Sequence, residues 1–111
     1  MNRAMLLSAV VVALALPGQA QATGTGLRTI TNIGCHLNNN TCWVDISGSA
    51  VGPANCRATS IRFNITAPNG KNIFSLMTAA FLAGKQVSFE LPDTCYVDQP
   101  IYPTLTYMNF I

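Results

Sequence analysis

Residues 72–91, NIFSLMTAAFLAGKQVSFEL, contain a helix pattern followed directly by a strand pattern. Apolar residues first recur at the spacing i, i+3, i+4, i+7 and i+8, which marks one face of an α-helix. They are Ile73, Leu76, Met77, Ala80 and Phe81. We therefore expect one helix of about three turns, with Asn72 as its N-cap and Gly84 just beyond its C-terminal end.

Strand patterns with a period of two lie on both sides of this helix. Gln86–Leu91 alternates between apolar and polar residues immediately after it. Before the helix, Cys42–Ser47 and Ser60–Thr66 alternate in the same way, and β-branched residues mark a further strand at Leu27–Ile33. The last strand is expected at Tyr102–Ile111, which is apolar on both of its sides.

The expected order is three strands, one helix and two strands. This order matches the OB-fold, a five-stranded Greek-key barrel, with the helix between strands 3 and 4. We therefore predict a mainly β domain with this fold. The alternative is an α+β sheet with the helix packed across one face.

The first 22 residues have the layout of a secretory signal peptide. Arg3 supplies a positive charge, Ala4–Leu16 is predominantly apolar, and Ala20-Gln21-Ala22 forms a small-x-small cleavage site. The apolar run is shorter than the roughly 20 residues that cross a bilayer, so we expect no membrane anchor. We expect cleavage near Ala22 and a secreted or periplasmic protein with a single domain at residues 23–111.

Four cysteines follow this leader, an even number that suggests two disulfides in an oxidising compartment. Three pairings are possible. We favour Cys35–Cys42, which closes a short loop, and Cys56–Cys95, which closes a long one. A zinc site is the alternative, but the sequence contains no C-x2-C pair. We therefore predict a disulfide-stapled domain without a metal ion.

Charge and side-chain chemistry argue against several function classes. The chain has six Lys and Arg residues and four Asp and Glu residues, and its cations are scattered. We therefore expect neither nucleic-acid binding nor a polybasic membrane patch. His36 is the only histidine, whereas a catalytic triad or a hydrolytic zinc site needs further matching groups. We expect no catalytic residue, no enzymatic activity and no cofactor.

Strand alternation places Trp43 and Asp45 on the side of their strand that faces away from the core. Aromatic rings stack on sugars, and carboxylates accept hydrogen bonds from hydroxyl groups. Together with Tyr96, these residues are candidate glycan contacts. The two-sided apolar character of the last strand instead suggests a subunit interface. Its candidate interface residues are Leu105, Tyr107, Met108 and Phe110.

The segment FSLMTAAFLAGKQVSFELPDTC, residues 74–95, joins an apolar helix, an A-x-x-A-G-K-x-V turn into a strand, and a cysteine soon after. This order resembles the binding subunits of subtilase-cytotoxin-like AB5 toxins and related small secreted bacterial proteins. The resemblance implies an OB-fold subunit, a ring-shaped homopentamer, recognition of sialylated or other host glycans, and a toxin A subunit as partner. It also implies a glycan contact at Thr25, where the toxin relatives have a small hydroxyl residue.

These features lead to one main hypothesis and one alternative. The main hypothesis is an exported, non-catalytic binding module that resembles the glycan-binding B subunit of an AB5-type toxin. The alternative is a stand-alone periplasmic or secreted protein that binds or inhibits another protein and has no toxin role. A neighbouring gene for an exported toxin enzyme would favour the first.

Overall fold

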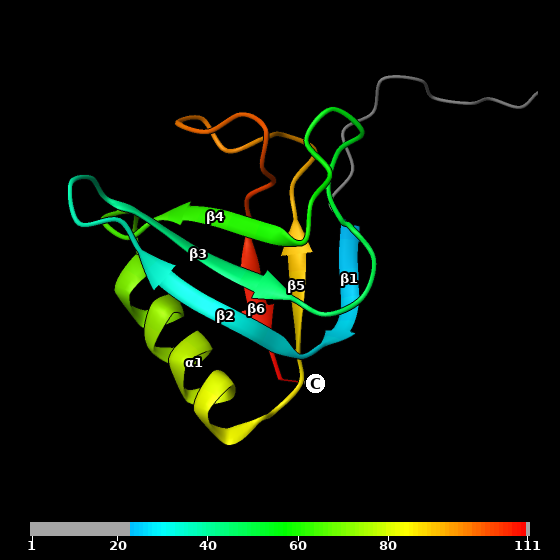
Figure 1. Cartoon of the computed structure of the whole chain (residues 1–111), viewed down its shortest axis with the longest axis vertical. Helices are drawn as coiled ribbons and strands as arrows, with labels where there is room; N and C mark the ends of the chain where they lie inside the picture. The colour runs from blue at the N-terminus through cyan, green and yellow to red at the C-terminus, as the bar shows by residue number, and fades with distance from the viewer. Residues whose placement is uncertain (1–22, 111) are drawn as a thin grey trace, which may run out of the picture.

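The structure, a computed structural model, describes residues 23–110 (Figure 1). The expected signal peptide, residues 1–22, lies outside the described residues. The elements are β1 (Thr23–Arg28), β2 (Ile30–Cys35), β3 (Thr41–Ile46), β4 (Ser60–Asn64), α1 (Gly70–Ala83), β5 (Val87–Leu91) and β6 (Tyr107–Asn109). In the described part of the chain, the helix lacks the length and apolarity needed to cross a membrane.

The strands form two three-stranded antiparallel sheets, in the orders β1-β5-β6 and β2-β3-β4. The domain is thus mainly β, as the sequence predicts. The expected five-stranded Greek-key barrel is not confirmed, because there are six strands and the two sheets do not close on each other. The difference begins in the predicted strand Leu27–Ile33, which is divided between the two sheets.

Thr29 is the residue at which the chain passes from one sheet to the other. Just before it, Gly26 has a φ of 72°, and the pairing register with β5 shifts between Gly24 and Leu27. Such a bulge bends a strand and increases its local twist. Ser47 then holds the crossing point, because its backbone N–H donates to the Thr29 carbonyl at 2.9 Å and its hydroxyl accepts from the Thr29 N–H at 2.9 Å.

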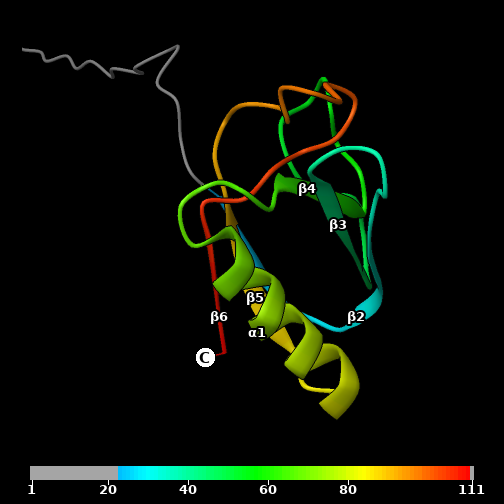
Figure 2. The ribbon, with the colours of Figure 1, turned by 90° about the vertical axis from the view of Figure 1, so that its left-hand side faces the viewer.

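The core lies between the two sheets and under the helix. The inward residues of the strands alternate as the sequence predicts, and Val44, Ile61, Val87 and Phe89 are completely buried. Figure 2 shows α1 between β6 and β2, in front of β5. Burial of these side chains supplies the main driving force for folding, at roughly 25 cal/mol per Å² of apolar surface.

The helix begins three residues earlier than expected. Asn69 occupies the N-cap position in a left-handed conformation, with a φ of 62°, so Asn72 lies inside the first turn instead. The first residue of the helix, Gly70, has to be a glycine, because a Cβ atom there would come within 2.5 Å of the Ile65 carbonyl oxygen. At the other end, Gly84 is the left-handed C-cap, as predicted.

The buried side of the helix is narrower than its apolar stripe. Met77 and Ala80 are buried in the core, whereas Leu76 is 41% exposed and Phe81 38% exposed. The neighbouring Leu82 is 78% exposed. The helix contacts the rest of the fold along one flank, so part of its predicted stripe faces outward.

The predicted last strand, Tyr102–Ile111, is also shorter than expected, because only Tyr107–Asn109 forms β6. Pro103 lacks an N–H group and cannot donate to a strand partner. The chain from Cys95 to Pro103 instead forms a small closed unit, which we call the 95–103 lobe. An isolated bridge pairs its two ends, and the Tyr96 N–H donates to the Tyr102 carbonyl at 2.9 Å.

Candidate binding face

The outward face of sheet β2-β3-β4 carries the most distinctive group of side chains. The register places Trp43 on β3 between Gly34 on β2 and Arg62 on β4. One pair further along, Asp45 lies between Asn32 and Ser60. Their neighbours in sequence turn into the core, so regular strand alternation alone brings these polar and aromatic groups onto one surface.

Trp43 lies over Gly34. A Cβ atom on Gly34 would come within 2.6 Å of the indole ring, so only glycine leaves room for the ring in this position. The indole N–H donates a hydrogen bond to Oδ1 of Asn32 at 3.1 Å. The His36 ring meets the indole edge-on, with 5.3 Å between ring centroids. The indole is therefore positioned on three sides and remains only half-buried.

Arg62 connects Trp43 to the 95–103 lobe. Its guanidinium carbon is 5.2 Å from the Trp43 ring centroid and 3.8 Å from that of Tyr102. Nε donates to the Ser60 hydroxyl at 3.0 Å, and Nη1 donates to Oε1 of Gln99 at 2.9 Å. Cation–π contacts of this kind are worth about 0.5–1 kcal/mol each at exposed sites. We call the line formed by His36, Trp43, Arg62 and Tyr102 the aromatic row.

The 95–103 lobe is held against the sheet by several independent contacts. The Cys56–Cys95 disulfide joins its first residue to the loop that follows β3, and Figure 1 shows the lobe beside that loop. The Arg62 N–H donates to the Pro103 carbonyl at 2.9 Å. Pro103 also packs so closely on Gly52 that a Cβ there would come within 2.6 Å of it. These contacts keep Tyr102 in place at the end of the aromatic row.

The second disulfide, Cys35–Cys42, is at the opposite end of the row and joins β2 to β3 across their connecting loop. Both disulfides have the pairing that the sequence analysis favours. His36 follows Cys35 directly, and its N–H donates to the Thr41 carbonyl at 2.9 Å. Each end of the aromatic row is therefore next to a covalent crosslink.

Asp45 extends this face with a carboxylate that has unused hydrogen-bonding capacity. Its Oδ1 atom is buried and has no hydrogen-bond partner among the described residues. A buried acceptor without a donor costs about 1–3 kcal/mol. A ligand that brings a hydroxyl group to this carboxylate after a small side-chain movement would recover part of that cost.

The structure brings together only two of the four predicted glycan contacts. Trp43 and Asp45 share the outward face, whereas Tyr96 is 7% exposed and its hydroxyl forms a 2.8 Å hydrogen bond with that of Thr41. Thr25 lies on β1, in the other sheet. Its hydroxyl donates to the Gly26 carbonyl at 2.8 Å and accepts from the Phe89 N–H at 3.1 Å, so it supports the β1 bulge.

Several residues of the face were missed by the sequence analysis. Alternation predicts that Arg62 faces outward, but nothing in the sequence indicates that it contacts Trp43 and Tyr102 together. The contribution of Gln99 depends on the folded shape of the lobe. Only the pairing of Cys56 with Cys95 could have signalled that the lobe returns to this sheet.

The predicted interface residues divide between the core and the surface. Met108 is 7% exposed and belongs to the core, and Leu105 packs against that core. Tyr107 is 49% exposed and Phe110 36% exposed. Two of the four predicted interface residues thus belong to the domain's own core or pack against it, and Tyr107 and Phe110 remain available for contact with another surface.

Comparisons with known proteins add no relative to this description. No protein-family model matches the chain, no curated protein matches it, and no solved structure matches it. The interpretation of the aromatic row therefore depends on its own geometry and chemistry.

Proposed function

We propose that this protein is an exported, non-catalytic binding module that recognises glycans through the aromatic row and Asp45. The observation that carries the proposal is the Trp43 ring, which is fixed over Gly34 and still partly accessible to solvent. The C–H face of a sugar ring stacks on such an indole, and its hydroxyl groups bond to nearby carboxylates and amides. Asp45, Asn32 and Gln99 supply those groups around the row.

We further propose that the domain is a partly open OB-like barrel in which β1 and β2 act as one bent first strand. The junction of these strands at Thr29 supports this, as does the hydrogen bond from the Arg62 N–H to the Pro103 carbonyl between β4 and the chain before β6. In this numbering β3 and β4 are the second and third strands, and the lobe lies between the fourth and fifth. OB-folds bind oligosaccharides and oligonucleotides on that combination of strands and loops.

Export is part of the proposal. Two disulfides indicate an oxidising compartment, and the signal-peptide pattern of residues 1–22 agrees with it. A homopentameric ring with a toxin A subunit is the finer form of the proposal, based on the resemblance to AB5 binding subunits. Exposed apolar side chains support a further surface contact, and they include Tyr107, Phe110, Leu76 and Leu82.

The second candidate function is a stand-alone protein that binds or inhibits another protein. Exposed apolar residues at the ends of the aromatic row favour it. Leu37 follows His36 and is fully exposed, and Ile101 precedes Tyr102 and is 67% exposed. Aromatic residues and arginine surrounded by apolar side chains are typical of protein interfaces.

The two functions are separated by a pair of variants tested on an array of sialylated and neutral glycans. If glycans bind at the row, Trp43→Ala abolishes glycan binding, whereas Ile101→Ala leaves it within about twofold, because an exposed rim side chain contributes little. Circular dichroism and the oxidised mass of both variants establish that they are folded. Glycan binding that survives Trp43→Ala, or an array without any bound glycan, contradicts the glycan proposal.

A further inference from the structure

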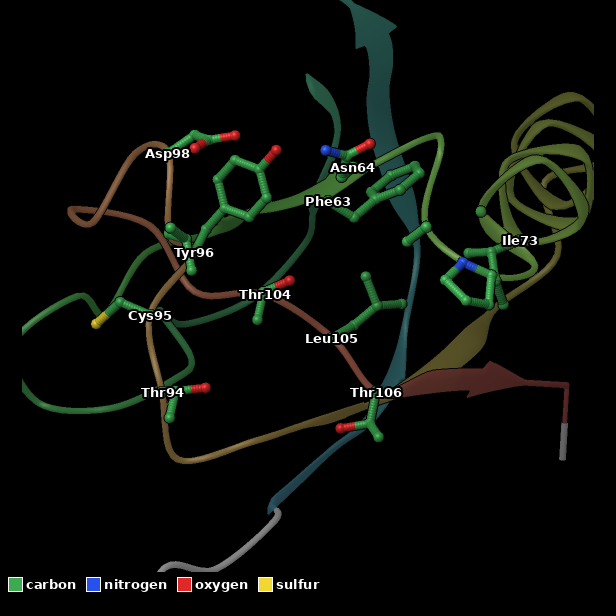
Figure 3. A pocket seen from close by; sticks show the side chains of 14 residues that line it. Phe63, Asn64, Ile73, Thr94, Cys95, Tyr96, Asp98, Thr104, Leu105 and Thr106 are labelled. Atoms are coloured by element: carbon green, nitrogen blue, oxygen red, sulfur yellow. The ribbon is translucent and has the colours of Figure 1, made fainter. Parts of the chain in front are cut away.

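A pocket of about 530 Å³ lies beside the 95–103 lobe, whose residues 95–98 form part of its lining (Figure 3). Its walls come from the end of β4, the start of α1, and the chain segments 94–98 and 104–106. This volume falls in the range of about 300–1,000 Å³ that is usual for small-molecule sites. The pocket goes beyond the proposed glycan site, because none of the four residues of the row lines it.

The deeper part of the pocket is apolar. Phe63 is nearly buried, and Ile73 and Leu105 are partly buried against the hydrophobic core. Figure 3 shows Phe63, Ile73 and Leu105 on one side of the pocket, and Tyr96 and Asp98 on the other. A hydrocarbon body of a ligand would replace water on these apolar side chains, which is favourable in proportion to the area covered.

The polar side chains that line the pocket include a negative charge. Asp98 is exposed at the rim and is the charged side chain among the described residues that line the pocket, which include no Lys, Arg or His. The threonine hydroxyls of the lining and the Asn64 amide are neutral. Tyr96 adds an aromatic ring next to Asp98. A carboxylate beside an aromatic ring attracts cations, whereas an anionic ligand would meet no opposite charge.

We propose that this pocket binds a small organic cation, an ammonium group carried on an apolar body. The body lies against Phe63, Ile73 and Leu105, and the ammonium group lies between the Asp98 carboxylate and the Tyr96 ring. The Tyr96 ring is preset for this contact, because its hydroxyl is already bonded to the Thr41 hydroxyl at 2.8 Å in a buried position. The lobe therefore serves two sites, with Tyr102 and Gln99 at the row and with Tyr96 and Asp98 at the pocket.

The test uses three probes that carry the same phenyl ring and differ in the charge of the polar group. They are benzylammonium, benzyl alcohol and benzoate, titrated into the oxidised ¹⁵N-labelled protein and followed by amide chemical shifts. We expect benzylammonium to bind most tightly and benzoate most weakly. The perturbed amides should include Asn64, Ile73 and Thr106 around the pocket.

Three substitutions test whether the probes bind in this pocket and through Asp98. Asp98→Asn should weaken benzylammonium binding by about twofold to fivefold, as expected for an exposed ion pair, and leave benzyl alcohol unchanged. Asp93→Asn removes an exposed acid that does not line this pocket and is the matched control. Ala67→Leu adds bulk at an exposed lining position and should abolish binding of all three probes.

Other outcomes overturn the proposal. Benzoate binding as tightly as benzylammonium would show that the charge of the probe plays no role. An equal loss of benzylammonium affinity in Asp98→Asn and Asp93→Asn would show that only the net charge of the protein matters. Shift changes confined to the exposed helix residues Leu76 and Leu82 would place the probes elsewhere. Trp43→Ala should not affect the probes, so a failed glycan proposal leaves this one standing, and the reverse is also true.

Discussion

The outward faces of the two sheets differ, although their inward faces are alike. Both sheets turn alternate apolar residues into the shared core. Outward, sheet β1-β5-β6 presents the polar side chains of Ser88, Glu90 and Asn109 beside the exposed Leu27 and Tyr107. Sheet β2-β3-β4 instead presents Trp43 and Arg62, together with a lobe folded over its edge. Burial of apolar side chains therefore explains the inward faces of both sheets. On the outward face of sheet β2-β3-β4, by contrast, side chains are held in fixed positions although burial does not require it.

The difference depends on long-range contacts. The Cys56–Cys95 disulfide joins the lobe that completes the aromatic row to the loop that follows β3, with a sequence separation of 39 residues, whereas Cys35–Cys42 spans 7. In the chain-entropy description, longer loops stabilise more when they are closed. The two crosslinks should therefore contribute differently both to overall stability and to the outward face of sheet β2-β3-β4.

Among the changes that affect the outward face of sheet β2-β3-β4, removal of the long-range disulfide should have the largest effect. The double variant Cys56→Ser/Cys95→Ser is expected to lose about 4 kcal/mol of unfolding free energy, against about 2 kcal/mol for Cys35→Ser/Cys42→Ser. Urea unfolding followed by circular dichroism measures both. The fluorescence of Trp43, the only tryptophan, should change in the first variant because the lobe positions Arg62 and Tyr102. Equal losses in the two variants would contradict the assignment of the lobe contacts to Cys56–Cys95.

Glycine substitutions compare the two outward faces directly. Gly34→Ala should cost about 1–3 kcal/mol, because the new Cβ would meet the Trp43 ring at 2.6 Å and overpacking displaces the ring. Gly24→Ala, on sheet β1-β5-β6, places its Cβ 3.3 Å from the flexible end of Glu90 and should cost less than about 0.5 kcal/mol. Thermal unfolding and tryptophan fluorescence measure both effects. An unchanged fluorescence spectrum in Gly34→Ala would show that Trp43 does not lie over Gly34.

The sequence predicts the parts of this molecule that depend on local patterns. The period-two alternation around Val44, Ile61 and Phe89 identifies three strands and their buried faces, and Gly84 marks the end of the helix. The split at Thr29 is harder to predict, because it depends on a bulge and on hydrogen bonds with Ser47, which is distant in the sequence.

The same limit, that local sequence patterns do not reveal long-range contacts, applies more strongly to the candidate binding face. Alternation predicts that Trp43 and Asp45 face outward, and this is a local property. The contact between Arg62 and Tyr102 joins residues 40 positions apart through a lobe that has no periodic pattern. Periodicity is insensitive to such contacts, so the row as a unit becomes visible only once the sheet register and the disulfide are known.

The smallest expected effect concerns the outward face of sheet β1-β5-β6. Tyr107→Ser should change the unfolding free energy by less than about 0.5 kcal/mol, because the side chain is half-exposed. The adjacent Met108→Ala should cost about 2–5 kcal/mol, because Met108 belongs to the core. Denaturation of the monomeric species measures both, and light scattering measures the mass of Tyr107→Ser. If this face is a subunit interface centred on Tyr107, light scattering shows a smaller assembly for Tyr107→Ser at unchanged monomer stability, because a few aromatic side chains carry most of the binding energy of such contacts. An assembly of unchanged mass would contradict an interface centred on Tyr107.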